Sequence, residues 1–278
     1  MIPNGIPESS FEPVKLDEVS QLNAALDGAS RSGLLFKMAR WEREKGWTQA
    51  LDAIGRARAR QDSQHTQIER SIGAPLLIAR SGGPTGQGGG LAHDAESRGL
   101  RVVSFDSEHD FVTGLGAGVR TGADVVSLRF GVSPSLARVL FAASDGVLAN
   151  SVSEPFGLVG LEAMAAGGVA FTGGTGEDYA IAGHNAVVLE TLDPMEIVSR
   201  WQEIADSPTL ASRLRRAARR TARQYQWRVV VNLLIESLSQ QARRRGILQP
   251  GAVPRRRRHR AHATMRFTNT AIDRASTA

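Results

Sequence analysis

The segment GVLANSVSEPFGLVGLEAMAAG, residues 146–167, joins a short apolar run to a helix-like stretch. Pro155 has no backbone N–H to lose in a first helical turn. We therefore expect Ser153 or Glu154 to be the N-cap and the helix to run from about Pro155 to Ala166. Glu154 would then lie in the loop, and the segment predicts one strand–loop–helix unit.

The same alternation extends in both directions along the chain. Helix-like stretches such as KGWTQALDAIGRAR and SPSLARVLFAAS, and three more between Pro194 and Arg245, separate short apolar runs: LLFKMA, PLLIAR, RVVSF, ADVVSL, GVLAN, VAFTGG and AVVLE. Strand and helix in repeated alternation are typical of an α/β protein with a parallel sheet. The sequence predicts a Rossmann-like doubly wound parallel sheet with extra C-terminal helices.

Ligands of such sheets bind outside the carboxyl ends of the strands, where loops lead into helices. Four loops therefore stand out as candidate binding loops: ARWEREKG (39–46), SGGPTGQGGG (81–90), NSVSEPFG (150–157) and TGGTGE (172–177). The second loop lacks the Gly-Lys-Ser/Thr of a P-loop and does not fit the dinucleotide-binding fingerprint. The sequence therefore gives little support to ATP or NAD binding.

Two glutamates flank the start of the helix that follows the third loop. The free N–H groups of Phe156, Gly157 and Leu158 would favour an anion there. Glu162, further along the helix, could accept hydrogen bonds from a vicinal diol, and Glu154 could bind hydroxyls at the other end of the same ligand. This spacing suits a nucleotide sugar. Spacing alone leaves open a second interpretation, in which Glu154 caps the helix and Glu162 is a solvated surface residue.

Composition restricts the class of protein. The chain has 278 residues, 41% of them hydrophobic, which is enough for a substantial core. No apolar run approaches the ~20 residues of a membrane span, and the start MIPNGIPESS lacks the features of a signal peptide, so we expect a cytoplasmic protein. The absence of cysteine excludes disulfides and thiolate metal sites.

The positive charge is concentrated at the C-terminal end. From Arg243 onward there are ten arginines and one acid, which gives +9, so residues 1–242 carry −3 of the net +6. We expect residues 243–278 to form a disordered basic tail. Two roles remain open for it, a solvated extension or weak contact with anionic surfaces, and no specific nucleic-acid partner is expected.

SEPFGLVGLEAMAAG resembles the E-x7-E segment of retaining GT-B glycosyltransferases, the group that includes bacterial glycogen synthase and sucrose synthase. Other segments resemble that family in the same order: NGIPESSFEP, LLFKMARWEREKG, FAASDGVLANSVSEPFG, GHNAVVLE and QYQWRVVV. Together they cover about residues 2–240. A lone E-x7-E is weak evidence, whereas the ordered set is specific. The resemblance implies the C-terminal, donor-binding half of a GT-B fold.

The resemblance also implies roles for particular residues. By this resemblance, Arg40 and Lys45 are expected to hold the donor diphosphate. Glu154 is expected to contact the transferred sugar, and Glu162 to bind the ribose. The remaining implied donor-binding residues offer backbone groups or shape the loops around the donor: Ser104, Gly82, Gly83, Phe156, Gly157, Leu158, Gly173 and Gly174.

The implied reaction is transfer of a hexosyl group from a nucleoside diphosphate sugar with retention of configuration. Charge that develops on the leaving diphosphate would be stabilised by two fixed cations. The family generally needs no metal and no cofactor besides the donor. DSEHD, Asp106 to Asp110, superficially resembles a metal-binding set, and we interpret it as a polar loop.

Several features depart from the family pattern. Ala39 replaces the glycine usual before the arginine, and Lys37 replaces an apolar strand residue. Residues 1–15 resemble an interdomain linker remnant before a nucleotide-sugar-binding domain of residues 16–242, and the amino-terminal lobe that carries the acceptor site lies outside this chain. It would be supplied in cis or in trans.

The C-terminal helical stretch has an apolar face with two possible roles. QWRVVVNLLIESLSQ places apolar side chains at near-helical spacing, and this face either packs on its own domain or binds a partner: Val229, Val230, Leu233, Leu234 and Leu238. The alternative to an enzyme domain is a non-catalytic binding or assembly module that keeps the half-fold. The sequence does not identify the sugar, the base or the acceptor.

Overall fold

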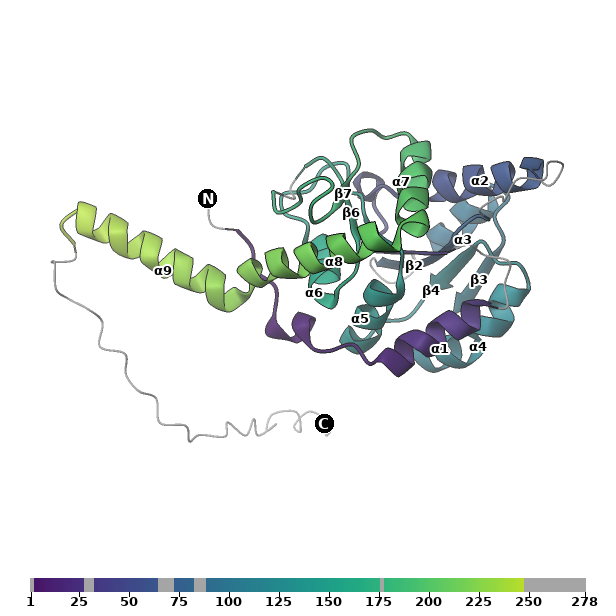
Figure 1. Cartoon of the computed structure of the whole chain (residues 1–278), viewed down its shortest axis with the longest axis horizontal. Coiled ribbons are helices and arrows are strands. Elements are labelled where there is room, and N and C mark those ends of the chain that lie inside the picture. The colour runs from purple at the N-terminus through teal and green to yellow at the C-terminus, as the bar shows by residue number, and fades with distance from the viewer. Residues whose placement is uncertain (1–2, 28–32, 65–72, 83–88, 176–177, 248–278) are drawn as a thin grey trace, which may run out of the picture. The chain divides into compact units, whose positions relative to one another are not determined.

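Seven strands form one sheet in the order β3-β4-β2-β1-β5-β6-β7 (Figure 1), and every pairing is parallel. The computed structural model describes residues 3–27, 33–64, 73–82, 89–175 and 178–247. The strands are β1 (Leu34–Arg40), β2 (Leu76–Gly82), β3 (Val102–Phe105), β4 (Val125–Leu128), β5 (Gly146–Ala149), β6 (Ala170–Thr172) and β7 (Val187–Val188). The predicted doubly wound parallel sheet is confirmed.

The apolar runs become strands because the sheet is buried on both faces. In β1, Leu34 and Phe36 pack into one core cluster and Leu35 packs into the other, as the two-residue repeat of a strand requires. Central strands of a parallel sheet therefore appear as continuous apolar runs rather than as alternating ones.

Helices cover both faces of this sheet (Figure 1). One cluster of buried side chains comes from the strands and from α2, α3 and α7. The other comes from the strands and from α1, α4 and α5. The helices are α1 (Leu16–Asp27), α2 (Trp47–Gln64), α3 (Gly89–Glu96), α4 (Glu108–Arg120), α5 (Pro134–Ala143), α6 (Leu158–Ala166), α7 (Pro194–Asp206), α8 (Pro208–Ala222) and α9 (Trp227–Arg244). None of those in the described residues has both the length and the apolar character that crossing a membrane requires.

Two sequence-based boundaries are wrong. The helix expected from Pro155 begins at Leu158 and has Gly157 as its N-cap, so neither Ser153 nor Glu154 caps it. DSEHD is not a loop throughout, because Ser107 caps α4 and Glu108, His109 and Asp110 lie in its first turn. The Ser107 hydroxyl accepts a hydrogen bond from the Asp110 N–H, as a helix N-cap does.

The segment before α1 is anchored to the domain. Ile6 is fully buried. Its N–H donates to the carbonyl of Tyr225 at 2.8 Å, and its carbonyl accepts from the Trp227 N–H at 3.1 Å. The first fifteen residues, predicted to be a linker remnant, thus include a position that is part of the core.

The chain divides into two units, residues 1–234 and 235–278, and the division falls within α9. In the first unit Val230 is buried, whereas Trp227, Leu233 and Leu234 are exposed. The predicted apolar face therefore packs on its own domain at Val230 and remains exposed at neighbouring positions. Residues 248–278, most of the predicted basic tail, lie outside the described residues.

Candidate functional site

A cavity of about 250 Å³ lies at the carboxyl ends of β1 and β5. These two strands are neighbours in the sheet, so their final residues and the loops that follow meet at one edge. The cavity is lined by the end of β1, by Lys45, by the loop after β5 and by the first residues of α6. Six predicted site residues line it: Arg40, Lys45, Glu154, Phe156, Gly157 and Leu158.

An ion pair joins the two loops across this cavity. The Lys45 ammonium lies 2.5 Å from the Glu154 carboxylate, and their side chains are 10% and 21% exposed. A pair this shielded is stronger than one on an open surface. Lys45 sits at the end of a 3-10 helix, Arg43–Lys45, immediately before Gly46, whose φ of 67° lets the chain turn into α2.

Arg40 lies at the mouth of the cavity in a more open setting. Its side chain is 68% exposed and pairs with Glu42 at 2.5 Å. Its carbonyl accepts a hydrogen bond from the Trp47 indole N–H at 2.7 Å. The backbone of Arg40 is thus fixed while its guanidinium can reorient toward an anion.

The start of α6 supplies free backbone donors, and these include two of the three predicted, Gly157 and Leu158. With Gly157 as the N-cap, the unpaired N–H groups of the first turn begin there and continue through Leu158 and Val159, while Phe156 precedes the helix. The Tyr179 hydroxyl donates to the Gly157 carbonyl at 2.7 Å, and the Val152 N–H donates to the Glu44 carbonyl at 2.7 Å. These bonds hold the preceding loop out of helical conformation and delay the helix start.

Glu162 does not line the cavity, although it lies on α6. No described residue donates a hydrogen bond to its carboxylate, and burial raises its pKa above the usual value of 4.5. Glu162 is therefore a partly desolvated carboxylate, and not the solvated surface residue of the second interpretation of the spacing. Its carboxylate oxygens can therefore accept hydrogen bonds from the hydroxyl groups of a ligand.

Glu162→Gln is expected to raise the melting temperature of the ligand-free chain at about pH 7.5 but not at about pH 3.5. A carboxyl group whose pKa is raised in the folded state binds its proton more tightly there. Folded-state stability is therefore lost as the pH rises through the unfolded-state pKa, and the loss is complete above the folded-state pKa. The measurement is thermal unfolding of both proteins at the two pH values.

Glu96→Gln, on an exposed position of α3, is the matched control and should melt like the parent at both pH values. An equal gain for Glu162→Gln at both pH values would contradict this charge-based account, because a packing effect does not depend on carboxyl protonation.

Lys37 is a site feature that the sequence did not reveal. Its side chain is 1% exposed and lies 5.0 Å from the centre of the Trp47 ring. Its ammonium donates to Asn150 at 2.5 Å, and the Asn150 amide donates to the Gly46 carbonyl at 3.1 Å. This chain of bonds ties the end of β5 to the turn after Lys45. The signal in the sequence was a charged residue inside an apolar strand.

The remaining predicted residues do not line the cavity. Ser104 lies in β3, at the edge of the sheet, and Gly174 follows β6 with open space beside it. Gly173 approaches the Ser151 carbonyl so closely that a Cβ atom would collide with it. Gly82 ends β2 and Gly83 lies outside the described residues.

Comparison with known proteins agrees with this geometry. Residues 122–221, which include the loop after β5 and all of α6, match the family described as glycosyl transferases group 1. The chain is similar to this family over that segment. It is 29% identical over 181 residues to a D-inositol 3-phosphate glycosyltransferase of Streptomyces avermitilis, a match that covers 64% of this chain and 34% of that protein.

Solved structures show the same fold as this chain. HepE of Anabaena, crystallised in complex with UDP and glucose, aligns with a TM-score of 0.62 at 18% identity, over 86% of this chain and 56% of that one. The C-terminal domain of LpcC from Francisella tularensis aligns with a TM-score of 0.55 at 14% identity, over 80% of this chain and 100% of that domain. The fold is that of one half of a GT-B enzyme, and the chain spans only part of its full-length relatives.

Proposed function

We propose that this chain is the donor-binding domain of a retaining glycosyltransferase that takes a nucleoside diphosphate sugar. One observation carries the proposal. Lys45, Arg40 and Glu154 meet the N-terminus of α6 in a single cavity at the carboxyl edge of the sheet. Two cations and free backbone N–H groups are suited to a diphosphate, and an adjacent carboxylate is suited to the hydroxyls of a sugar.

The Lys45–Glu154 pair gives the site a ligand-free resting arrangement. A bound diphosphate would replace the Glu154 carboxylate as the partner of Lys45, because it carries more charge within the same reach. Glu154 would then be released toward the sugar end of the donor. Binding would thus place both groups where each acts.

Lys45 and Arg40 would act when the glycosidic bond to the diphosphate breaks. Negative charge grows on the leaving oxygen at that moment, and fixed cations in a sheltered site stabilise it more than water does. Retention would follow if the acceptor attacks on the face that the diphosphate leaves. This mechanism needs no carboxylate pair of the glycosidase type.

Glu162 would bind the ribose hydroxyls of the donor. Its carboxylate is partly buried without a hydrogen-bond donor among the described residues, so two hydroxyl donors would offset its desolvation. HepE was solved with UDP and with UDP-glucose, which makes uridine nucleotides the first to test. The acceptor lobe would come from an adjoining domain or a separate chain.

Thermal unfolding in the presence of UDP, GDP, ADP and their glucose and mannose derivatives tests the proposal. We expect at least one series to raise the melting temperature by several degrees at millimolar concentration, and Lys45→Ala or Glu162→Ala to remove that shift. Lys15→Ala is the control, because the Lys15 side chain is exposed, pairs with Glu18 and does not line the cavity. This variant should keep the shift in melting temperature. Unchanged melting with every nucleotide would contradict the proposal and favour a non-catalytic module.

A further inference from the structure

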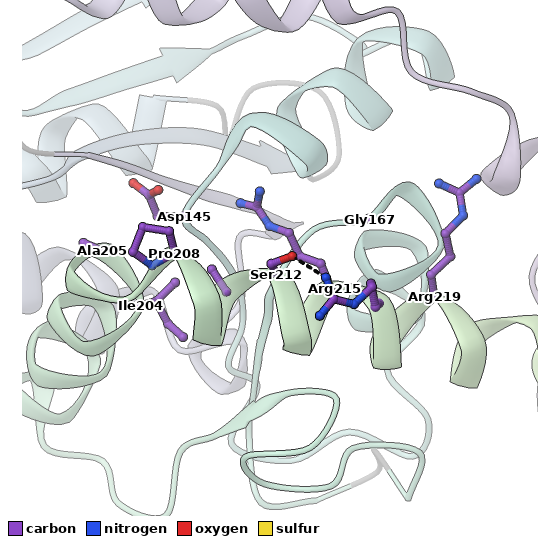
Figure 2. A pocket seen from close by; sticks show the side chains of 10 residues that line it. Asp145, Gly167, Ile204, Ala205, Pro208, Ser212, Arg215 and Arg219 are labelled. Atoms are coloured by element: carbon purple, nitrogen blue, oxygen red, sulfur yellow. Dashed lines mark hydrogen bonds between the residues drawn. The ribbon is translucent and has the colours of Figure 1, made fainter.

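A second cavity, of about 450 Å³, lies at the opposite end of the sheet. It is formed by the end of α7, one side of α8, Gly167 after α6 and Asp145 before β5 (Figure 2). The first cavity lies beyond the other end of β5, near Asn150, and a strand of this length separates the two ends by roughly 17 Å. A ligand in this cavity would therefore be separate from a donor in the first one.

The wall formed by α8 is strongly basic. Residues 208–223 contain six arginines and no acid. Arg215, Arg216 and Arg219 line the cavity, and Asp145 is its one acidic lining residue. Positions three and four apart share one side of a helix, which places these arginines and Ser212 along the side of α8 that borders the cavity.

Hydrogen bonds within the described residues use only part of the donor capacity of these arginines. Arg215 donates to the Ser144 carbonyl at 2.9 Å and Arg219 donates to the Phe11 carbonyl at 3.0 Å. Arg216 donates to the Ser212 hydroxyl at 2.7 Å, the bond drawn as a dashed line in Figure 2. The Arg215 Nε is buried and has no hydrogen-bond partner among the described residues.

Burial also makes an anion favourable at Arg215. It lowers the pKa of this guanidinium, an effect that the nearby Asp145 partly offsets. A guanidinium that has lost water on one side gains more from a bidentate oxyanion than a fully hydrated one does. The lining, to which three arginines of α8 contribute, points to an anion in the same way.

The other part of the cavity is apolar. Ile204, Ala205, Pro208 and Ala211 contribute to its lining. Figure 2 shows Ile204 and Pro208 at one end of the cavity and Arg219 at the other. A ligand that fills it would therefore have an anionic group and a small organic body, and the volume is in the usual range for small-molecule sites.

We propose that the cavity beside α8 binds a small soluble phosphate monoester, with its phosphate against Arg215 and Arg216 and its organic part toward Ile204 and Pro208. A membrane lipid would carry the same phosphate chemistry but fits this wall less well. The apolar residues of α8, such as Leu214 and Ala218, are buried in the domain and leave no apolar side to enter a bilayer. The inference does not depend on the function proposed for the first cavity.

Calorimetric titration of the full chain with phenyl phosphate, and with inorganic phosphate at matched ionic strength, tests the proposal. We expect saturable binding of phenyl phosphate that is tighter than that of inorganic phosphate and about fivefold or more weaker in Arg216→Gln. This variant should fold, because Arg216 is exposed and its hydrogen bond is to its own helix. Its melting curve checks that point.

A matched variant separates the site from a general effect of charge. Arg213→Gln removes the same charge from an exposed position of α8 that does not line the cavity, and should bind like the parent. Three results would overturn the proposal. These are equal weakening in Arg213→Gln and Arg216→Gln, no saturable binding of phenyl phosphate, and binding to phosphatidylglycerol vesicles alone.

Discussion

Replacing Lys45 with alanine is expected to weaken binding of a nucleoside diphosphate by about 100-fold. The Lys45 side chain is 10% exposed and faces the start of α6 across the cavity. Charge-assisted hydrogen bonds from such a sheltered ammonium to phosphate oxygens contribute about 1.5–3 kcal/mol, and the loss of long-range attraction adds to this. Calorimetric titration of both proteins with the nucleotide that gives the largest thermal shift measures the difference.

Glu154→Gln should change the same affinity in the opposite direction. The Glu154 carboxylate accepts a hydrogen bond from the Lys45 ammonium in the ligand-free chain. Its neutral isostere therefore removes a group that competes with the diphosphate for Lys45 and a negative charge that repels the diphosphate. We expect nucleoside diphosphate binding to become severalfold tighter, while sugar transfer by the complete enzyme is lost. Equal weakening by both variants would show that Lys45 acts by holding the two loops together rather than by binding the diphosphate.

The strands were predictable because each is short and flanked by polar loops, and the central ones are buried on both faces. Helix α4 was not, because its sequence EHDFVTGLGAGVR contains three glycines, which weaken helix propensity. Packing explains their presence. A Cβ atom at Gly118 would lie 2.9 Å from a Val103 methyl group, and one at Gly114 would lie 3.0 Å from the Phe105 ring. Close approach of α4 to β3 outweighs the cost of these glycines.

The position of the first cavity was also predictable, since the carboxyl ends of neighbouring parallel strands must meet. The start of α6 was not, because contacts from distant segments, including the Tyr179 hydroxyl, hold the preceding loop. Lys37 was noticed only as an anomaly, because its partner Asn150 follows another strand. The second cavity combines Asp145 with residues 204–219, a combination that no local pattern encodes.

Gly46→Ala is expected to lower the free energy of unfolding by about 3 kcal/mol or more, which corresponds to a fall in melting temperature of roughly 10 °C. Gly46 has a φ of 67°, and a side chain there costs about 1–2 kcal/mol. The added Cβ would also lie inside contact distance of the Asn150 carbonyl oxygen and 2.5 Å from its side-chain nitrogen. Because Asn150 is buried and bonded to Lys37, it cannot move aside without breaking that contact.

Gly99→Ala is the matched comparison for Gly46→Ala, because it has a similar φ of 73° but no atom within 4 Å of the added Cβ. It should cost only the backbone part, about 1–2 kcal/mol, so the difference between the variants measures how firmly Asn150 fixes the turn after Lys45. Gly46→Ala should also weaken diphosphate binding, whereas Gly99→Ala should not. Similar losses of stability in both variants, with unchanged binding, would show that Asn150 yields and that the turn does not depend on it.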